Sequence, residues 1–432
     1  MSHIVIVSAA YPPEPVVSAR MSRDLALHLL GLGHRVTVLC PQPSRPANAD
    51  YSGYREPGSC LAADEDGVEV VRLPSFAAPE SAVVPRLKES WSYGRHVCSY
   101  LAQRPAPDAL YVNAWPLLAQ ALVAAWAKRS AVPMVLQVMD VYPESLVNKL
   151  PAALRLMVSP LKALDAWVAR SATSVVTISE GMRRTYTVGR KVPAARVGAI
   201  PTWQDESIFA GAVSREEACR RYGVPAGRFT FLYLGNVGSV AGVDLLVRAF
   251  HRAGIDAAQL LVVGDGSQKS ACQQLAASLG AGNVSFISDH DVNNVPVLQG
   301  MADVCLLPLK RGAAQSSIPS KLPAYMFSGK PVLATVDGGS DTAQAIREAR
   351  AGWVGEPEDL EWLARKMQEV ALMENEELAA LGANARSYAL ERFSRGQGVS
   401  HLAGVVLAAL RDGQPELNPI RQEGGYGSAD SR

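Results

Sequence analysis

Short runs of aliphatic residues alternate along most of the chain with longer amphipathic stretches. The first run, at 4–7, precedes a loop with Pro12 and Pro13 and an amphipathic stretch at 18–30, which predicts strand, loop and helix in that order. Similar runs predict strands at 35–39, 68–73, 109–112, 134–138 and 174–178. Because strands that alternate with helices pair in parallel, the pattern predicts a doubly wound α/β sheet.

The same alternation starts again in the middle of the chain. A strand at 229–234 ends in a glycine loop that leads into a helix at 243–252, and further strands are predicted at 260–263, 284–287, 304–307 and 332–334. We therefore expect two Rossmann-like domains, at 1–205 and 206–390, that face an interdomain cleft. A helix at 391–411 is expected to pack back toward the first domain, and the polar tail at 412–432 to be disordered.

Composition narrows the possible functions. The 42 Lys and Arg residues against 41 Asp and Glu give a net charge of +1, which argues against a nucleic-acid partner. The longest apolar stretches fall short of the 18 residues that a membrane helix needs, and the first residues lack the features of a signal peptide. The six cysteines show no C-x-x-C spacing. These features predict a cytoplasmic protein with reduced thiols and no metal site.

Three loops carry residue types suited to phosphate. The segment at 235–242, Gly-Asn-Val-Gly-Ser-Val-Ala-Gly, lies between a predicted strand and helix, where backbone N–H groups and the helix dipole favour an anion. Gly264-Asp265-Gly266 follows the strand at 260–263, and Lys321 stands at the start of a helix, where a cation is unfavourable unless an anion accompanies it. Taken singly, Gly264-Asp265-Gly266 is as consistent with a tight turn as with a site, whereas a plain turn for the glycine loop and a solvated side chain for Lys321 are the less favoured alternatives.

Together the three loops resemble the C-terminal half of GT-B glycosyltransferases of family 4, and the likeness extends from residue 4 to about 405. The strings at 235–243 and 320–331 are similar to the L-fucosamine (L-FucNAc) transferases of bacterial O-antigen and capsule assembly. The resemblance implies a metal-independent, retaining transferase without a cofactor. It would move L-FucNAc or a related N-acetylhexosamine from a UDP-sugar donor to an undecaprenyl-diphosphate-linked sugar.

The resemblance also implies which residues bind the donor. Lys321 is expected to stabilise the departing diphosphate. The other expected donor contacts are Gly235, Asn236, Val237, Gly238, Gly242, Gly264, Asp265, Gly266, Ile287, Ser316, Ser317, Ile318 and Ser320. The chain departs from the family in having Ser316 and Ala324 where many members carry two glutamates. Because 235–247 also lacks a basic residue, diphosphate stabilisation would depend on Lys321, backbone N–H groups and Arg311.

In the N-terminal half the resemblance implies acceptor binding. Asp140, after the strand at 134–138, is expected to orient an acceptor hydroxyl, with Glu144 as a second candidate and Arg20 reaching the diphosphate or acceptor. A helix-capping carboxylate and a surface arginine are the alternative interpretations. The D-x-D pattern at 64–66 precedes Gly67 and a strand, and is interpreted as a solvated turn rather than a metal site.

The stretch at 146–169 mixes apolar residues with basic ones. It predicts either a core helix with a solvated basic face or peripheral docking at the cytoplasmic face of the inner membrane, where the lipid-linked acceptor would lie. Two other functions stay open: a non-catalytic subunit that binds a nucleotide-sugar, favoured by Ser316 and Ala324, and a nucleotide-sugar epimerase on the same scaffold.

Overall fold

The computed structural model describes residues 1–44, 50–54, 61–74, 83–113, 117–144, 158–211, 213–289, 291–312 and 318–412. The chain forms two compact units. Met1–Ile200 and the chain from Val399 onward make the first, and Pro201–Gly398 make the second. All but the first residue of the tail predicted at 412–432 lie outside the described residues.

The first unit is built on an eight-stranded sheet in the order β3-β4-β2-β1-β5-β6-β7-β8. All neighbouring strands are parallel except β3, which pairs antiparallel with β4. The strands are β1 (His3–Ser8), β2 (Arg35–Pro41), β3 (Leu61–Glu65), β4 (Val68–Leu73), β5 (Ala109–Asn113), β6 (Met134–Val138), β7 (Ser174–Thr177) and β8 (Val197–Ala199).

Helices of the first unit lie against the buried strands. Those described are α1 (Val17–Gly31), α2 (Val83–Ala102), α3 (Leu117–Arg129), α5 (Val158–Ser171) and α6 (Glu180–Arg184), followed by a π-helical turn, η3 (Thr185–Gly189). One core cluster joins α2, α3 and α5 to the sheet through residues such as Val97, Val123 and Val168. The long helix α15 (Arg395–Asp412) begins in the second unit and belongs to the first from Val399.

The second unit has a six-stranded sheet in the order β11-β10-β9-β12-β13-β14, and all its pairs are parallel. In chain order this is 3-2-1-4-5-6, the order of dinucleotide-binding Rossmann domains. The strands are β9 (Phe229–Leu234), β10 (Ala258–Val263), β11 (Val284–Ile287), β12 (Val304–Pro308), β13 (Val332–Thr335) and β14 (Gly352–Gly355).

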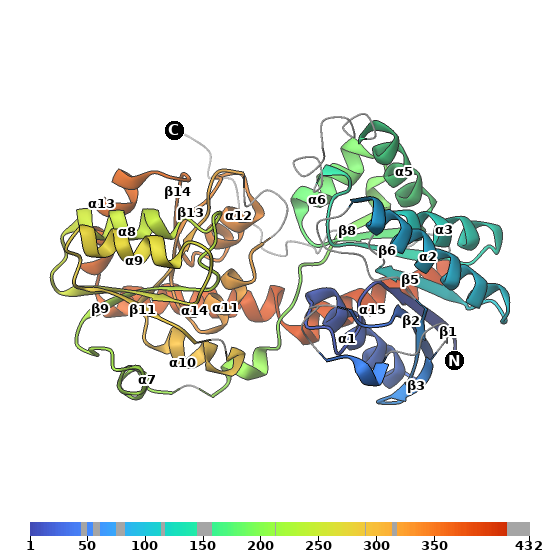
Figure 1. Ribbon diagram of the computed structural model, residues 1–432, viewed down its shortest axis with the longest axis horizontal. Helices are drawn as coiled ribbons and strands as arrows, with labels where there is room; N and C mark the ends of the chain where they lie inside the picture. Colours follow the sequence, from blue (N-terminus) through green and yellow to red (C-terminus); the bar gives the residue numbers. More distant parts are fainter. Residues whose placement is uncertain are drawn as a thin grey trace, which may run out of the picture. The chain divides into compact units, whose positions relative to one another are not determined.

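Helices cover both faces of this second sheet (Figure 1). The helices α8 (Val243–Ala253), α9 (Lys269–Ser278) and α13 (Leu360–Ala371) pack on the face that carries Phe231 and Tyr233. The opposite face, with Leu232 and Leu307, is covered by α7 (Arg215–Tyr222), α10 (Val295–Gly300), α11 (Lys321–Phe327), α12 (Asp341–Glu348) and α14 (Asn375–Arg392). Because successive side chains of a strand point to opposite faces, Phe231 and Tyr233 of β9 enter one helix layer and Leu232 enters the other.

The predicted α/β fold with two Rossmann-like domains is confirmed, and every predicted strand is present. Three strands were not predicted: β3, β8 and β14. The sequence of β3 is Leu-Ala-Ala-Asp-Glu, β8 is three residues long, and every residue of β14 is only partly buried. None of the three therefore has the apolar run that predicts a buried strand.

Candidate active site

The strand order of the second sheet indicates where a ligand would bind. The chain runs outward from β9 through β10 to β11, and then returns to β12 and runs outward on the other side. In such sheets ligands bind beyond the carboxyl ends of the strands where the order reverses, which here is between β9 and β12. The glycine loop at 235–242 follows β9, and the segment that leads to α11 follows β12.

The glycine loop packs directly on the turn after β10. Gly264 has φ +126°, and a Cβ atom there would overlap the carbonyl oxygen of Gly235. Gly264 N donates to Ile287 O at 2.9 Å, and Val237 N donates to Asp265 O at 2.8 Å, so the ends of β9, β10 and β11 are tied together. The glycine loop and the turn at 264–266, both predicted to bind phosphate, therefore form one continuous backbone surface.

Lys321 reaches this surface from the first position of α11. Its side chain crosses over Gly235, where a Cβ atom would overlap Lys321 Cε. Nζ donates a hydrogen bond to Tyr233 Oη and lies 4.3 Å from the centroid of the Tyr233 ring. Burial lowers the pKa of the Lys321 ammonium to about 8, and no carboxylate in the described part of the chain pairs with it. A buried cation of this kind is suited to an anionic ligand.

Tyrosines fix the end of β9 beneath the lysine. Tyr325 Oη accepts a hydrogen bond from Leu234 N at 3.0 Å and donates to Leu234 O at 3.2 Å. Tyr233 Oη donates to Asn236 O at 2.6 Å. Sequence reasoning missed Tyr233, because its position in an apolar strand predicts only a core residue; the available signal was a hydroxyl one residue before the strand end.

The other predicted donor residues are dispersed around this centre. The Asp265 carboxylate accepts a hydrogen bond from Lys269 Nζ at 2.5 Å, and that ammonium also donates to Ser288 Oγ at 2.6 Å. Gly242, at φ +62°, is the N-cap residue of α8. The Asn236 side chain lies against Gly238: its Nδ2 atom would be 3.0 Å from a Cβ atom at that position.

The segment before α11 is described only in part. Ser316 and Ser317 lie outside the described residues, and Ile318 packs against the core. The carbonyl of Ser320 accepts a hydrogen bond from Gln204 Nε2 at 2.6 Å. Ala324 is buried within α11. Arg311 is exposed, and its guanidinium lies 3.9 Å from the Glu356 carboxylate.

In the first unit, Asp140 and Glu144 have different environments. Asp140 is exposed after β6. Glu144 forms ion pairs with Arg190 at 2.7 Å and with Lys162 at 3.2 Å. Burial raises the pKa of the Glu144 carboxyl, but hydrogen bonds from Arg190, the backbone and Lys162, together with the charge of Arg190, lower it by more, so the net shift of the pKa is downward. Arg20 is exposed on α1. The Asp140 residue is thus exposed to solvent, whereas Glu144 is engaged in ion pairs within the protein.

The buried guanidinium of Arg190 organises the loop after β6. It donates to Asp165 Oδ2 at 2.6 Å, to the Tyr142 carbonyl at 2.7 Å and to Glu144 at 2.7 Å. Asp165 also accepts a hydrogen bond from Tyr186 Oη at 2.9 Å. The loop that carries Asp140 is therefore linked to α5 and to η3 through Arg190, and the Lys162–Glu144 ion pair is a second link to α5.

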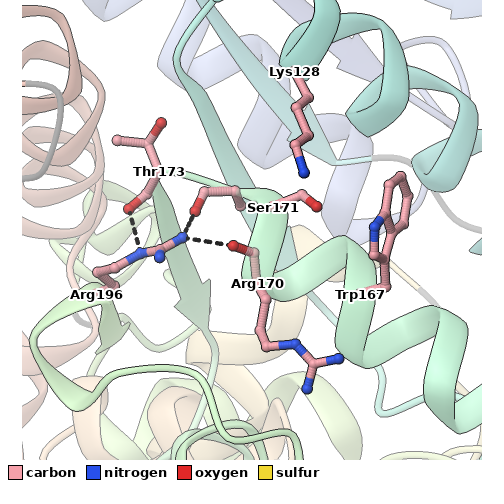
Figure 2. A pocket seen from close by; sticks show the side chains of 7 residues that line it. Lys128, Trp167, Arg170, Ser171, Thr173 and Arg196 are labelled. Carbon is pink, nitrogen blue, oxygen red and sulfur yellow. Dashed lines mark hydrogen bonds between the residues drawn. The ribbon is translucent and has the colours of Figure 1, made fainter.

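A pocket of about 390 Å³ in the first unit has basic and aromatic walls. Its lining residues are Lys128, Trp167, Arg170, Ser171, Ala172, Thr173 and Arg196. Figure 2 shows that the Arg196 guanidinium donates to carbonyl oxygens at the end of α5, including those of Thr173 at 3.2 Å and Arg170 at 3.0 Å. Because cations complement the dipole at helix C-termini, helix capping accounts for Arg196, and we assign no substrate to this pocket.

Other features bear on metal and membrane binding. The D-x-D segment ends β3 and begins the turn to β4, where Asp64 accepts a hydrogen bond from Gly67 N and Asp66 pairs with Arg23. The described residues contain no group of three or more His, Cys, Asp or Glu side chains that could hold a metal ion. No helix within the described ranges is both long enough and apolar enough to cross a membrane.

Replacing Gly264 with alanine is expected to destabilise the second unit by roughly 2–3 kcal/mol, because the new Cβ meets backbone that has no alternative position. Urea unfolding followed by tryptophan fluorescence measures the loss. The control is Gly280→Ala, at φ +65° with no atom within 4 Å of the new Cβ, which should cost about 1 kcal/mol. Equal losses in the two variants would contradict the close approach of the two glycine segments.

Two Rossmann-like domains, one with phosphate-suited loops at its switch point, are the architecture expected of a GT-B glycosyltransferase. Sequence comparison agrees: residues 18–203 match the glycosyl transferase 4-like domain, and residues 214–388 match glycosyl transferases group 1. The two matches together span most of the chain, and the chain belongs to family 4 of the GT-B glycosyltransferases.

Individual relatives are distant. WcaI of Escherichia coli (strain K12), named as a colanic acid biosynthesis glycosyl transferase, is 24% identical over 391 residues, 86% of this chain and 92% of WcaI. WbjE of Pseudomonas aeruginosa, named as a glycosyltransferase, is 27% identical over 312 residues, 70% of this chain and 73% of WbjE. The crystal structure of Anabaena HepE with UDP and glucose superposes with a TM-score of 0.65 at 16% identity, covering 94% of this chain and 100% of HepE. The narrower resemblance to L-fucosamine transferases stays a prediction.

Proposed function

We propose that this glycosyltransferase moves L-FucNAc, or a related N-acetylhexosamine, from a UDP-sugar to an undecaprenyl-diphosphate-linked sugar in O-antigen, capsule or exopolysaccharide synthesis. The donor assignment rests mainly on the Lys321 ammonium, which is held over the glycine loop and has no carboxylate partner among the residues that the structure describes. Similarity to WcaI supports a role in polysaccharide synthesis, and the UDP complex of HepE supports the nucleotide. The sugar itself rests on the resemblance of the two loop strings.

In the proposed reaction the bond between the sugar C1 and the diphosphate oxygen breaks, and a bond from C1 to the acceptor hydroxyl oxygen forms. The acceptor proton goes to the departing phosphate, with retention at C1. Lys321 and the N–H groups of the glycine loop stabilise the negative charge that grows on the diphosphate. We assign binding of the acceptor hydroxyl to Asp140, which is exposed after β6, with Arg20 as a further contact. No cofactor or metal enters this scheme.

The lipid-linked acceptor places the reaction at the cytoplasmic face of the inner membrane, and we propose peripheral contact there. The predicted basic stretch at 146–169 is described only from 158, within α5. There Lys162 pairs with Glu144, and Arg170, one residue beyond the stretch, donates to the Arg190 carbonyl at 3.1 Å. Those contacts do not favour α5 as the membrane surface, so the proposal rests on the acceptor.

Binding and turnover measured together test the proposal. Calorimetry with UDP and GDP is expected to show selective UDP binding. Incubation of UDP-L-FucNAc or UDP-GlcNAc with a GlcNAc-diphospho-lipid should give a new lipid-linked disaccharide, detected by mass spectrometry. Failure to bind either nucleotide would contradict the donor site. UDP binding without transfer or hydrolysis of any UDP-sugar would favour the non-catalytic subunit, which the absence of a carboxylate at Ala324 also favours.

A further inference from the structure

Lys321 belongs to a helix on one face of the second sheet, whereas the side chain with which it forms a hydrogen bond, Tyr233, lies on the opposite face. The helix α11 packs on the sheet face that carries Leu232, whereas Tyr233 belongs to the opposite face with α8. The lysine can cross between the layers only because Gly235 has no side chain. Its ammonium thus ends beside the Tyr233 hydroxyl rather than in solvent.

The Tyr233 hydroxyl has two partners and connects two parts of the donor site. It accepts a hydrogen bond from Lys321 Nζ and donates one to the Asn236 carbonyl in the glycine loop at 2.6 Å. The ring supplies a second contact, because Nζ lies 4.3 Å from its centroid and an ammonium is attracted to an aromatic face. The hydroxyl is therefore placed to fix the ammonium relative to the loop.

We propose that Tyr233 is a positioning residue: it holds Lys321 in its charged form beside the glycine loop, ready for the diphosphate of a nucleotide. This inference rests on the proposed function, because it takes the diphosphate as the ligand of Lys321. Tyr233 acts through Lys321 and through the loop, and contacts with the nucleotide are made by those groups.

Among the protein groups near the Lys321 ammonium, Lys321 itself is the one that we expect to change its protonation between pH 7 and 9. The tyrosines near it are Tyr233 on β9 and Tyr325 in α11, and burial raises the pKa of each far above that range. Cys272 on α9 interacts with Tyr233, and Cys305 on β12 with Tyr325; burial raises the pKa of both thiols, that of Cys305 to about 12. No described carboxylate pairs with the ammonium.

The pKa of Lys321 gives the sign of the expected pH dependence. Burial lowers it to about 8 in the free protein. A diphosphate binds the ammonium better than the neutral amine, so UDP affinity should fall as the pH rises through 8, and binding at pH 8 should take up a proton. Without the Tyr233 hydroxyl the ammonium loses an acceptor, its pKa falls further, and the decline of affinity should begin about one pH unit lower.

The experiment titrates UDP into the wild type, Tyr233→Phe and Tyr325→Phe between pH 6.5 and 9, in buffers of different ionisation enthalpy. Tyr233→Phe is expected to bind UDP about tenfold more weakly than the wild type at pH 8, with the gap narrowing toward pH 6.5. Tyr325→Phe is the matched control, because it removes hydrogen bonds from the same strand end without touching Lys321. It should leave the midpoint of the pH profile at its wild-type value.

Each result has a defined meaning. A shifted midpoint in Tyr233→Phe alone supports the inference. An unchanged profile, equal midpoint shifts in both variants, or tighter UDP binding by Tyr233→Phe would overturn it while leaving the proposed function in place. If the wild type binds no UDP at any pH, the proposed function fails, and the role of Tyr233 fails with it.

Discussion

Replacing Lys321 with methionine is expected to lower kcat/KM for the sugar donor by about 100- to 1,000-fold, or about 2.7–4 kcal/mol of transition-state stabilisation. Negative charge on the diphosphate increases as the bond to the sugar breaks, and Lys321 is the ammonium held at the glycine loop. Methionine keeps the length and apolar part of the side chain. Initial rates of UDP release with UDP-L-FucNAc and the lipid acceptor measure the effect.

The control for this variant is Lys330→Met in the same unit. Lys330 is also a buried ammonium whose pKa burial lowers, but its Nζ donates to the Ala302 carbonyl at 2.7 Å. Its loss should reduce stability and leave kcat/KM per folded molecule within a few-fold of the wild type. If both methionine variants lose activity in proportion to their folded fraction, Lys321 has a structural role only.

Replacing Arg190 with methionine is expected to destabilise the first unit by about 3–5 kcal/mol, the usual cost of removing one partner of a buried ion pair. The side chains of Arg190 and Asp165 are 6% and 4% exposed, and loss of the guanidinium leaves the Asp165 carboxylate without its cation. Chemical unfolding at pH 7 measures the loss. Arg35→Met is the surface control: its ion pair with Glu69 spans 3.3 Å, its side chain is 60% exposed, and it should cost under about 1 kcal/mol.

The Arg190 variant should also respond to pH and to a second substitution. Burial raises the pKa of the Asp165 carboxyl even with Arg190 present, so without the guanidinium the carboxyl should take up a proton more readily. A folded-state pKa above the unfolded value makes the ionised form destabilising, so stability should recover as the pH falls toward 5. Adding Asp165→Asn should recover part of the loss at pH 7. A loss that neither change reduces would indicate packing rather than charge.

Elements that follow from short runs of neighbouring residues could be predicted from the sequence, whereas features that depend on contacts between distant residues could not. The strand at 229–234 and the helix after it follow from short runs of residues, and the structure has them as β9 and α8. The strand β14 could not be predicted, because an edge strand with partly buried residues has no apolar run. The glycine segments were selected as phosphate loops, but their contact depends on strand pairing between Leu234 and Val263, which local patterns do not reveal.

Side-chain environments were predictable only in part. That Lys321 stands at the start of a helix was expected, whereas its passage over Gly235 to Tyr233 depends on two helix layers meeting at one strand end. For Glu144 the sequence left two interpretations open, a catalytic carboxylate and a structural one. The cation that engages it, Arg190, is 46 residues away in sequence, so no local motif could have indicated the pair.

The chain leaves its first unit after Ile200 and returns to it at Val399, with the whole second unit between these two segments. During synthesis the ribosome must therefore translate all of the second unit before the last helix of the first becomes available. Leu402 and Val406, both fully buried in the folded protein, are synthesised only after the whole second unit has been translated. The second unit is a continuous segment and can fold before the last helix of the first unit has been synthesised. This chain is thus expected to reverse the usual order in which N-terminal domains are completed first.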